Sequence, residues 1–339
     1  GLSGPLPWER ERWTQAAMSR PRMRLVVTAD DFGYCPRRDE GIVEAFLAGA
    51  VTSVSLLVNG AATESAAELA RRHSIPTGLH ANLSEGRPVG PARRGASSLL
   101  GPEGFFLGKM GFREAVAAGD VDLPQVRKEL EAQLSCFREL LGRAPTHADG
   151  HQHVHVLPGV CQVFAEALQA YGVRFTRLPL ERGVGGCTWL EAPARAFACA
   201  VERDARAAVG PFSRHGLWTD AFVGLSTCGR HMSAHRVSGA LARVLEGTLA
   251  GHTLTAELMA HPGYPSVPPT GGCGEGPDAF SCSWERLHEL RVLTAPTLRA
   301  QLAQDGVQLC ALDDLDSKRP GEEVPCEPTL EPFLEPSLL

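Results

Sequence analysis

Short apolar runs alternate with longer amphipathic segments along most of the chain. Most of the short runs are rich in β-branched residues, and we predict strands at 24–31, 52–60, 77–83, 147–156, 173–180, 221–226, 253–263 and 307–315. The longer segments carry apolar residues at helical spacing and predict helices, at 38–51, 64–73, 123–142, 159–172, 192–208, 233–247 and 284–304. Strands that alternate with helices in this way are typical of βα units around a parallel sheet.

The number of these units favours a closed or nearly closed barrel over an open nucleotide-binding sheet. Glycine-rich phosphate motifs are missing, since no G-x-G-x-x-G follows the first strand and no G-x-x-x-x-G-K-[ST] occurs. The predicted fold class is therefore α/β, a TIM-like (β/α) barrel, with a distorted or a seven-stranded form as alternatives. Two Gly- and Pro-rich segments, 84–122 and 263–277, are predicted to be loop insertions at its mouth.

Both ends of the chain differ in composition from the segment between them. We expect residues 23–316 to form a single catalytic (β/α)-barrel domain. Residues 1–22 are predicted to be a flexible extension before the fold, with Met18 as a candidate natural start. The Pro- and Glu-rich tail, 317–339, is predicted to be disordered because it has too few apolar residues to bury.

Composition and charge exclude several classes of protein. A net charge of −6 argues against a nucleic-acid binder, and no apolar run is long enough to cross a bilayer. The ten cysteines are spread singly, without a C-x-x-C pair. That pattern is typical of reduced thiols, and it predicts a cytoplasmic, or also nuclear, location.

The stretch "HADGHQHVHV", residues 147–156, concentrates candidate chemistry. If it is a strand, its alternate residues Asp149, His151, His153 and His155 face the same side. Other polar residues stand at the ends of other predicted strands, and the carboxyl ends of parallel strands converge on the mouth of a barrel. These residues are Asp30 and Asp31 after the first strand, His80 in the third, Arg177 in the fifth and His261 in the seventh.

Together these side chains suit metal-assisted hydrolysis. A carboxylate and two imidazoles are a common hydrolytic metal set, here Asp31, His80 and one histidine of 151–155. A second carboxylate, Asp30, is placed to take a proton from water, and a further histidine to protonate the leaving group. Each residue also has a structural interpretation: the aspartate pair as a loop or helix-cap feature, His80 as a hydrogen-bonded core or surface histidine, and Arg177 as a surface or ion-pair arginine.

Five motifs together resemble those of YdjC-type carbohydrate deacetylases. They are "TADDFG" (28–33), "VTSVSLLVNG" (51–60), "GLHANLSEGRPV" (78–89), "PTHADGHQHVHVLP" (145–158) and "AHPG" (260–263). Their order and spacing also match, and the resemblance runs from about Met23 to Leu315. It implies a (β/α)-barrel hydrolase that removes acetyl groups from N-acetylated, chito-oligosaccharide-like sugars and uses one divalent metal, most often magnesium.

The resemblance also assigns roles by position. It implies that Asp31, His80 and His151 hold the metal, that Asp30 accepts the proton and that His261 is the acid. Asp149 then orients a ligand histidine, while His153 and His155 become supporting or proton-transfer residues, with His153 an alternative acid. We expect Arg177 to hold Asp30 ionised. The family commonly has Ser between Asp149 and His151 where this chain has Gly150, a change expected to loosen the loop slightly.

Several alternatives stay open at this point. The imidazoles suit zinc or another transition metal at least as well as magnesium. The chain could instead be another metal-dependent amidase or a phosphoesterase, or a non-catalytic binding protein that retains the fold. Expected partners are the acetylated oligosaccharide, with no nucleic acid and no membrane. A homodimer and a protein partner bound through the tail 317–339 are further hypotheses.

Overall fold

A computed structural model of the chain describes residues 21–246, 248–249 and 251–316. The predictions of a flexible N-terminal extension and a disordered tail fall almost wholly on 1–20 and 317–339, outside the described residues. Among the described residues, no helix combines the length and the apolar character that crossing a membrane requires.

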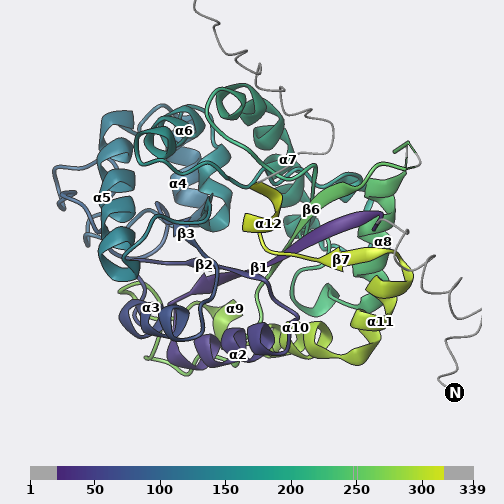
Figure 1. The fold of residues 1–339 in the computed structure, drawn as a ribbon. Helices are drawn as coiled ribbons and strands as arrows, with labels where there is room; N and C mark the ends of the chain where they lie inside the picture. Colours follow the sequence, from purple (N-terminus) through teal and green to yellow (C-terminus); the bar gives the residue numbers. More distant parts are fainter. Residues whose placement is uncertain (1–20, 247, 250, 317–339) are drawn as a thin grey trace, which may run out of the picture.

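One parallel sheet of seven strands lies at the centre of the described fold (Figure 1). Its order is β4-β3-β2-β1-β6-β5, and β7 pairs with β1 as well. The long strand β1 aligns with β6 from Met23↔Leu254 to Ala29↔Ala260. The strands are β1 (Met23–Phe32), β2 (Ser53–Leu56), β3 (Thr77–Ala81), β4 (Ala148–Gly150), β5 (Ala221–Val223), β6 (Leu254–Ala260) and β7 (Val307–Leu309).

Isolated backbone bridges close this sheet into a distorted barrel. The Ala148 amide donates to the Phe175 carbonyl (3.0 Å), and the Thr176 amide donates to the Leu217 carbonyl (2.9 Å). The chain then runs from Leu217 into β5, which pairs with β6. The strand predicted at 173–180 is thus reduced to two bridge residues, since Pro179 has no amide to donate to a strand neighbour. The predicted TIM-like, distorted barrel is confirmed.

Helices surround the strands, as Figure 1 shows. The predicted helix at 284–304 is in fact two helices, because Pro296 holds the preceding Ala295 in an extended conformation (ψ 139°). The segment 84–122, predicted to be loop, contains the helix α4. The helices are α2 (Pro36–Leu47), α3 (Thr63–Arg72), α4 (Lys109–Ala117), α5 (Leu123–Leu141), α6 (Val160–Ala170), α7 (Ala192–Ser213), α8 (Ala234–Leu245), α9 (Ala279–Cys282), α10 (Glu285–Thr294), α11 (Pro296–Gln304) and α12 (Asp313–Asp316), with the 3₁₀ segments η1 (His151–Val156), η2 (Val184–Gly186) and η3 (Gly229–His231).

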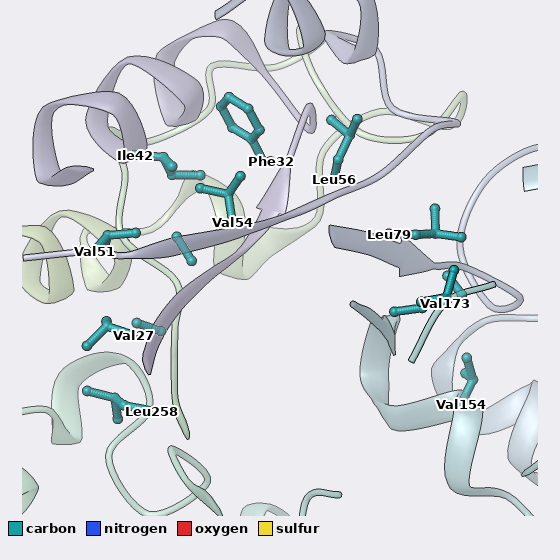
Figure 2. Packing of buried hydrophobic residues seen from close by; sticks show 14 of the residues in the cluster. Val27, Phe32, Ile42, Val51, Val54, Leu56, Leu79, Val154, Val173 and Leu258 are labelled. Carbon is teal, nitrogen blue, oxygen red and sulfur yellow. The ribbon is translucent and has the colours of Figure 1, made fainter. Parts of the chain in front are cut away.

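The hydrophobic core lies between the strands and the helices that cover them. Figure 2 shows Phe32 of β1, Ile42 of α2 and Val54 of β2 pointing toward one another. Nearly every residue of β1 is buried, as expected for a parallel strand covered on both faces. This rigid frame fixes where β1 ends, and the acidic residues near that end are therefore held in place.

We expect Ile42→Ala to lower the free energy of unfolding by about 2–5 kcal/mol, because Ile42 is fully buried and its loss leaves a cavity. Leu47→Ala on the same helix is the matched control. Leu47 is 63% exposed, so its truncation should cost less than about 0.5 kcal/mol. Urea unfolding curves measure both values. Equal losses in the two variants would contradict this account of the core.

Candidate active site

The polar residues predicted to meet at the mouth do meet there. Asp30 and Asp31 lie near the end of β1, His80 lies in β3, and Asp149 lies in β4. His261 follows β6 directly. Parallel strands bring these distant residues to one end of the barrel, as the sequence predicted.

A bulge in β1 turns two consecutive carboxylates into the site. Ala29 pairs with Val54 and Phe32 pairs with Leu56, so two residues of β1 stand opposite one residue of β2. Asp31 there has a left-handed backbone (φ 64°). In a regular strand Asp30 and Asp31 would face opposite sides. With the bulge, both contact site residues.

Three atoms converge at nearly equal distances. Asp31 Oδ1 lies 3.1 Å from His80 Nε2 and 3.1 Å from His151 Nδ1. The two ring nitrogens lie 3.2 Å apart. Two ligands bound to one metal at about 2.0–2.1 Å are separated by about 2.8–3.4 Å, the shorter values in octahedral and the longer in tetrahedral geometry. The spacing therefore fits a shared cation, and the buried Asp31 Oδ1 has no hydrogen-bond partner to occupy it.

A carboxylate holds the outer nitrogen of each of these histidines. His80 Nδ1 donates to Asp149 Oδ1 (2.6 Å), and His151 Nε2 donates to Glu85 Oε2 (2.7 Å). Such outer carboxylates fix the ring orientation and the tautomer of a metal-binding histidine. Asp149 thus holds the ring of His80, which agrees with its expected role of orienting a ligand histidine. Glu85 was missed, although it lies inside the quoted motif "GLHANLSEGRPV", because loop carboxylates usually face solvent.

Arg177 lies among three carboxylates from three strands. It donates to both oxygens of Asp30, from Nη1 to Oδ2 (2.8 Å) and from Nη2 to Oδ1 (2.7 Å). Its Nε donates to Glu257 Oε1 (3.0 Å), and Nη2 also lies 3.1 Å from Asp149 Oδ2. All four side chains are buried. The predicted contact between Arg177 and Asp30 is present as a bidentate pair.

Burial and neighbouring charges shift the pKa values of the convergent residues. Burial disfavours the charged form of His80, but Asp149 and Asp30 outweigh it and raise the pKa of His80 to about 10. For His151 burial is likewise outweighed, by Asp31 and Glu85, and its pKa rises to about 9. Arg286 and the two histidines hold the pKa of buried Asp31 well below its usual value. This environment favours positive charge next to Asp31.

The buried carboxylates outnumber the buried cations around this cluster. Arg38 and Arg286 both approach Asp31 Oδ2, at 3.4 and 3.0 Å, and Arg177 is the third guanidinium. Five carboxylates contact these arginines or the ligand histidines, an excess of two negative charges that a divalent cation would balance. They are Asp30, Asp31, Glu85, Asp149 and Glu257.

The predicted strand at 147–156 is wrong beyond Gly150. The chain turns there into η1, with left-handed backbones at Gln152 (φ 55°) and His153 (φ 59°). The histidines at 151, 153 and 155 consequently do not share one strand face. A period of two residues predicts a strand, but it cannot reveal a turn that follows the third residue of that strand.

His153 and His155 point into aromatic surroundings. His153 packs near Phe222, and burial with Arg177 nearby holds its pKa well below the usual value. His155 packs against Phe164, and its Nε2 donates to the Arg177 carbonyl (2.7 Å). Burial lowers the pKa of His155 to about 4. His155 therefore supports the backbone that presents Arg177.

Gly150 tightens this turn instead of loosening it. A Cβ atom at Gly150 would lie 2.5 Å from His155 Nδ1 and 2.7 Å from the His155 amide nitrogen. Glycine lets the chain fold closely back on itself there. The expected loosening is therefore not what the structure has, and a serine would require His155 to shift.

His261 lies at the edge of the cluster and is partly exposed. Its Nε2 is 3.8 Å from Asp30 Oδ2, and its Nδ1 is 3.8 Å from Glu289 Oε2. Burial and the nearby Arg286 lower the pKa of His261 to about 4. The ring is therefore neutral near pH 7. Sequence reasoning missed Arg38, Arg286 and Glu289, since charged residues within helices normally face solvent.

Comparisons with known proteins agree with this fold and these motifs. The family model described as YdjC-like protein matches residues 24–304. A human protein named carbohydrate deacetylase is 99% identical over 95% of this chain and 100% of its own. A chitooligosaccharide deacetylase from Serratia marcescens is 34% identical over 86% of this chain and 98% of its own. A crystal structure from Enterococcus faecalis, provisionally named a cellobiose-phosphate cleavage protein, superposes with a TM-score of 0.65 at 22% identity, covering 88% of this chain and 99% of that one.

The barrel with its convergent carboxylates and histidines defines an α/β-barrel protein with a candidate metal centre at the carboxyl ends of its strands. The family model and these relatives identify it further: the chain belongs to the YdjC-like protein family.

We expect the contribution of His155 to stability to depend on pH. Its pKa is lowered in the folded protein, so neutral His155 stabilises the fold fully above about pH 6.5, and this contribution is lost as the pH falls toward 4. The difference in unfolding free energy between wild type and His155→Gln should therefore shrink by about 3 kcal/mol from pH 7 to pH 4. Urea titrations at several pH values measure it. If the difference in unfolding free energy between the two proteins stays constant with pH, His155 does not have a lowered pKa in the folded protein.

Proposed function

We propose that this protein hydrolyses the acetamide group of N-acetylated, chito-oligosaccharide-like sugars with the help of one divalent metal. Asp31, His80 and His151 would hold that metal, Asp30 would accept the proton of the attacking water, and His261 would protonate the departing amine. The observation that carries the proposal is the convergence of the three ligand atoms within 3.1–3.2 Å around an oxygen without a hydrogen-bond partner.

The enzyme class rests on the relatives described above. The chain is a carbohydrate deacetylase, a hydrolase that acts on C–N bonds other than peptide bonds. The sugar length and the metal are the finer part of the proposal. Support for chito-oligosaccharides comes from the name of the Serratia relative.

When bound, the metal would supply Lewis-acid polarisation of the acetyl carbonyl and lower the pKa of water. We propose magnesium from the family resemblance. The two imidazoles also suit zinc, cobalt or nickel, whereas magnesium prefers oxygen ligands. The outer carboxylates Asp149 and Glu85 are compatible with magnesium and with a transition metal. They keep the inner nitrogens of His80 and His151 directed at Asp31.

Asp30 is proposed to receive a proton and pass it on. The bidentate pair with Arg177 orients both of its oxygens. His261 Nε2 lies 3.8 Å away and is neutral near pH 7, so the proton it gives to the amine must arrive during turnover. We propose that the proton leaves water for Asp30, passes to His261 and reaches the amine nitrogen as the C–N bond breaks. His153, the alternative acid, has no such carboxylate contact among the described hydrogen bonds and ion pairs.

The two segments predicted at the mouth contact each other and are proposed to shape the sugar site. The Gly86 amide donates to Glu275 Oε1 (2.9 Å), and the Arg87 amide donates to the Cys273 carbonyl (2.8 Å). Loops held by a rigid scaffold commonly set specificity. The cytosolic or nuclear location is also a proposal. It is supported by the cysteines of the described residues, all of which are free thiols.

We expect Asp30→Asn to lower kcat for deacetylation at least about 100-fold, because an amide cannot accept the proton from water. Acetate release from chito-oligosaccharides measures the effect, with elemental analysis of each preparation. Metal content should be retained, since Asp30 is not a proposed ligand. Chelation should abolish the wild-type activity, and readdition of magnesium or zinc identifies the working metal.

The matched comparison is His151→Ala, which should lose activity and metal together. Full activity of both variants in metal-loaded protein would refute the proposed function. Hydrolysis of phosphate esters in place of acetamides would favour the phosphoesterase alternative.

We expect Glu85→Gln to weaken metal binding about 10- to 100-fold, because it removes the charge that orients and polarises His151. Competition with a chromophoric chelator measures the dissociation constant. Tyr34→Phe is the control, since it removes the other hydrogen bond to Glu85 (2.8 Å) but keeps the carboxylate. Its effect should be much smaller. Unchanged affinity in Glu85→Gln would show that Glu85 does not act on the metal through His151.

A further inference from the structure

A second group of potential ligands stands beside the proposed active site. Cys228 directly precedes η3, His261 follows β6, and Glu289 lies in α10. His261 Nδ1 lies 3.8 Å from Cys228 Sγ and 3.8 Å from Glu289 Oε2. These three atoms all lie within 4.8 Å of one another.

The spacing is close to that of a zinc site. A thiolate and an imidazole on one zinc are separated by about 3.6 Å, and an imidazole and a carboxylate by about 3.4 Å, given tetrahedral geometry with ordinary bond lengths. The observed 3.8 Å distances require contractions of only a few tenths of an ångström. Three protein ligands would leave a fourth position open to water.

The Glu289 carboxylate is fixed by hydrogen bonds, and the donor atoms of the three residues can still bind a cation. The Gly229 amide donates to Glu289 Oε2 (2.9 Å), and the His261 amide donates to Glu289 Oε1 (2.9 Å), which fixes the carboxylate. Each carboxylate oxygen keeps a further lone pair. Cys228 and His261 are partly exposed whereas Glu289 is fully buried, so a cation would enter from the side of the thiol and the imidazole.

We propose that Cys228, His261 and Glu289 form a second cation site, distinct from Asp31–His80–His151, that takes a thiophilic divalent metal such as zinc. The thiolate gives the site its preference, because sulfur ligands favour zinc and disfavour magnesium. The Asp31 cluster has only oxygen and nitrogen donors. The two sites therefore differ in chemistry although His261 borders both.

The charges around the second site are mixed. Glu285 lies near Cys228 on the acidic side, while Arg286 and Lys109 lie on the basic side. Zinc binds cysteine as the thiolate, so it would displace the thiol proton of Cys228 when it binds.

Occupation of this site would inhibit deacetylation, a consequence that rests on the proposed role of His261. Coordination through Nδ1 leaves the remaining ring proton on Nε2, the nitrogen that faces Asp30. That nitrogen then has no lone pair to accept the proton from Asp30. Zinc at the second site thus blocks the proposed proton path without displacing the catalytic metal.

Cobalt titration of magnesium-loaded, full-length protein tests the site directly. Cobalt bound to Cys228 should produce a thiolate-to-cobalt charge-transfer band, which the Asp31 cluster cannot give because it contains no sulfur. Cys228→Ser should lose this band and bind one zinc fewer per chain by elemental analysis. The exposed Cys199 supplies the matched control, since Cys199→Ser should keep both.

Activity measurements test separately whether zinc at the second site inhibits deacetylation. Zinc added to the magnesium-loaded wild type should inhibit at a concentration at least about tenfold lower than in Cys228→Ser, because the variant loses one of three ligands. A band and a zinc stoichiometry that persist in Cys228→Ser would overturn the site. Loss of the band in Cys228→Ser with equal zinc sensitivity would leave the site standing and overturn the inhibition, and with it the proposed proton path through His261. Failure of the deacetylase assay itself would overturn only the proposed function, since the cobalt band needs no turnover.

Discussion

The site and the barrel both depend on the buried ion pairs of Arg177. Its guanidinium contacts Asp30 of β1, Asp149 of β4 and Glu257 of β6. These three strands lie in different parts of the ring. It directly follows Thr176, where the ring closes through bridges and not through a full strand. One buried cation therefore ties strands together where backbone pairing is sparsest. Without it, three buried carboxylates would lose the guanidinium that neutralises them, which is costly in a protein interior.

The arginines around Asp31 leave one of its two oxygens unsatisfied, and this makes the cluster a candidate metal site. Arg38 and Arg286 both approach Oδ2 of Asp31, whereas Oδ1 faces the two histidines and lacks a hydrogen bond. The fold thus satisfies one oxygen and leaves the other for a ligand. Raised histidine pKa values describe the same imbalance, because protons on His80 and His151 would supply the two missing positive charges. A divalent cation would supply the same charge without protonating the rings.

The sequence predicted the parts of the site that depend on strand order. Asp31, His80 and Asp149 sit in or near the ends of strands, and parallel pairing brings such ends together whatever the detail of the loops. The parts it missed depend on local backbone or on contacts across the chain. A period of two residues could not reveal the bulge at Asp31 or the turn after Gly150. Glu85, Arg286 and Glu289 resembled surface charges, and only the fold shows that they are buried, Glu85 and Glu289 beside histidines and Arg286 beside Asp31.

The bulge at Asp31 and the turn after Gly150, which the sequence did not reveal, both contain strained backbone. Left-handed backbones at residues other than glycine are unfavourable, and among the described residues they occur at Asp31, Ser74, Gln152 and His153. Three of these four are a proposed ligand or follow one within two residues. The strain at Asp31 brings its carboxylate beside that of Asp30, and the strain after His151 returns the chain so that His155 can hold the Arg177 carbonyl. Such strain persists because the buried ion pairs and the core around β1 over-determine these conformations. The residues that stabilise the barrel are therefore the same ones that hold its polar cluster in an otherwise unfavourable arrangement.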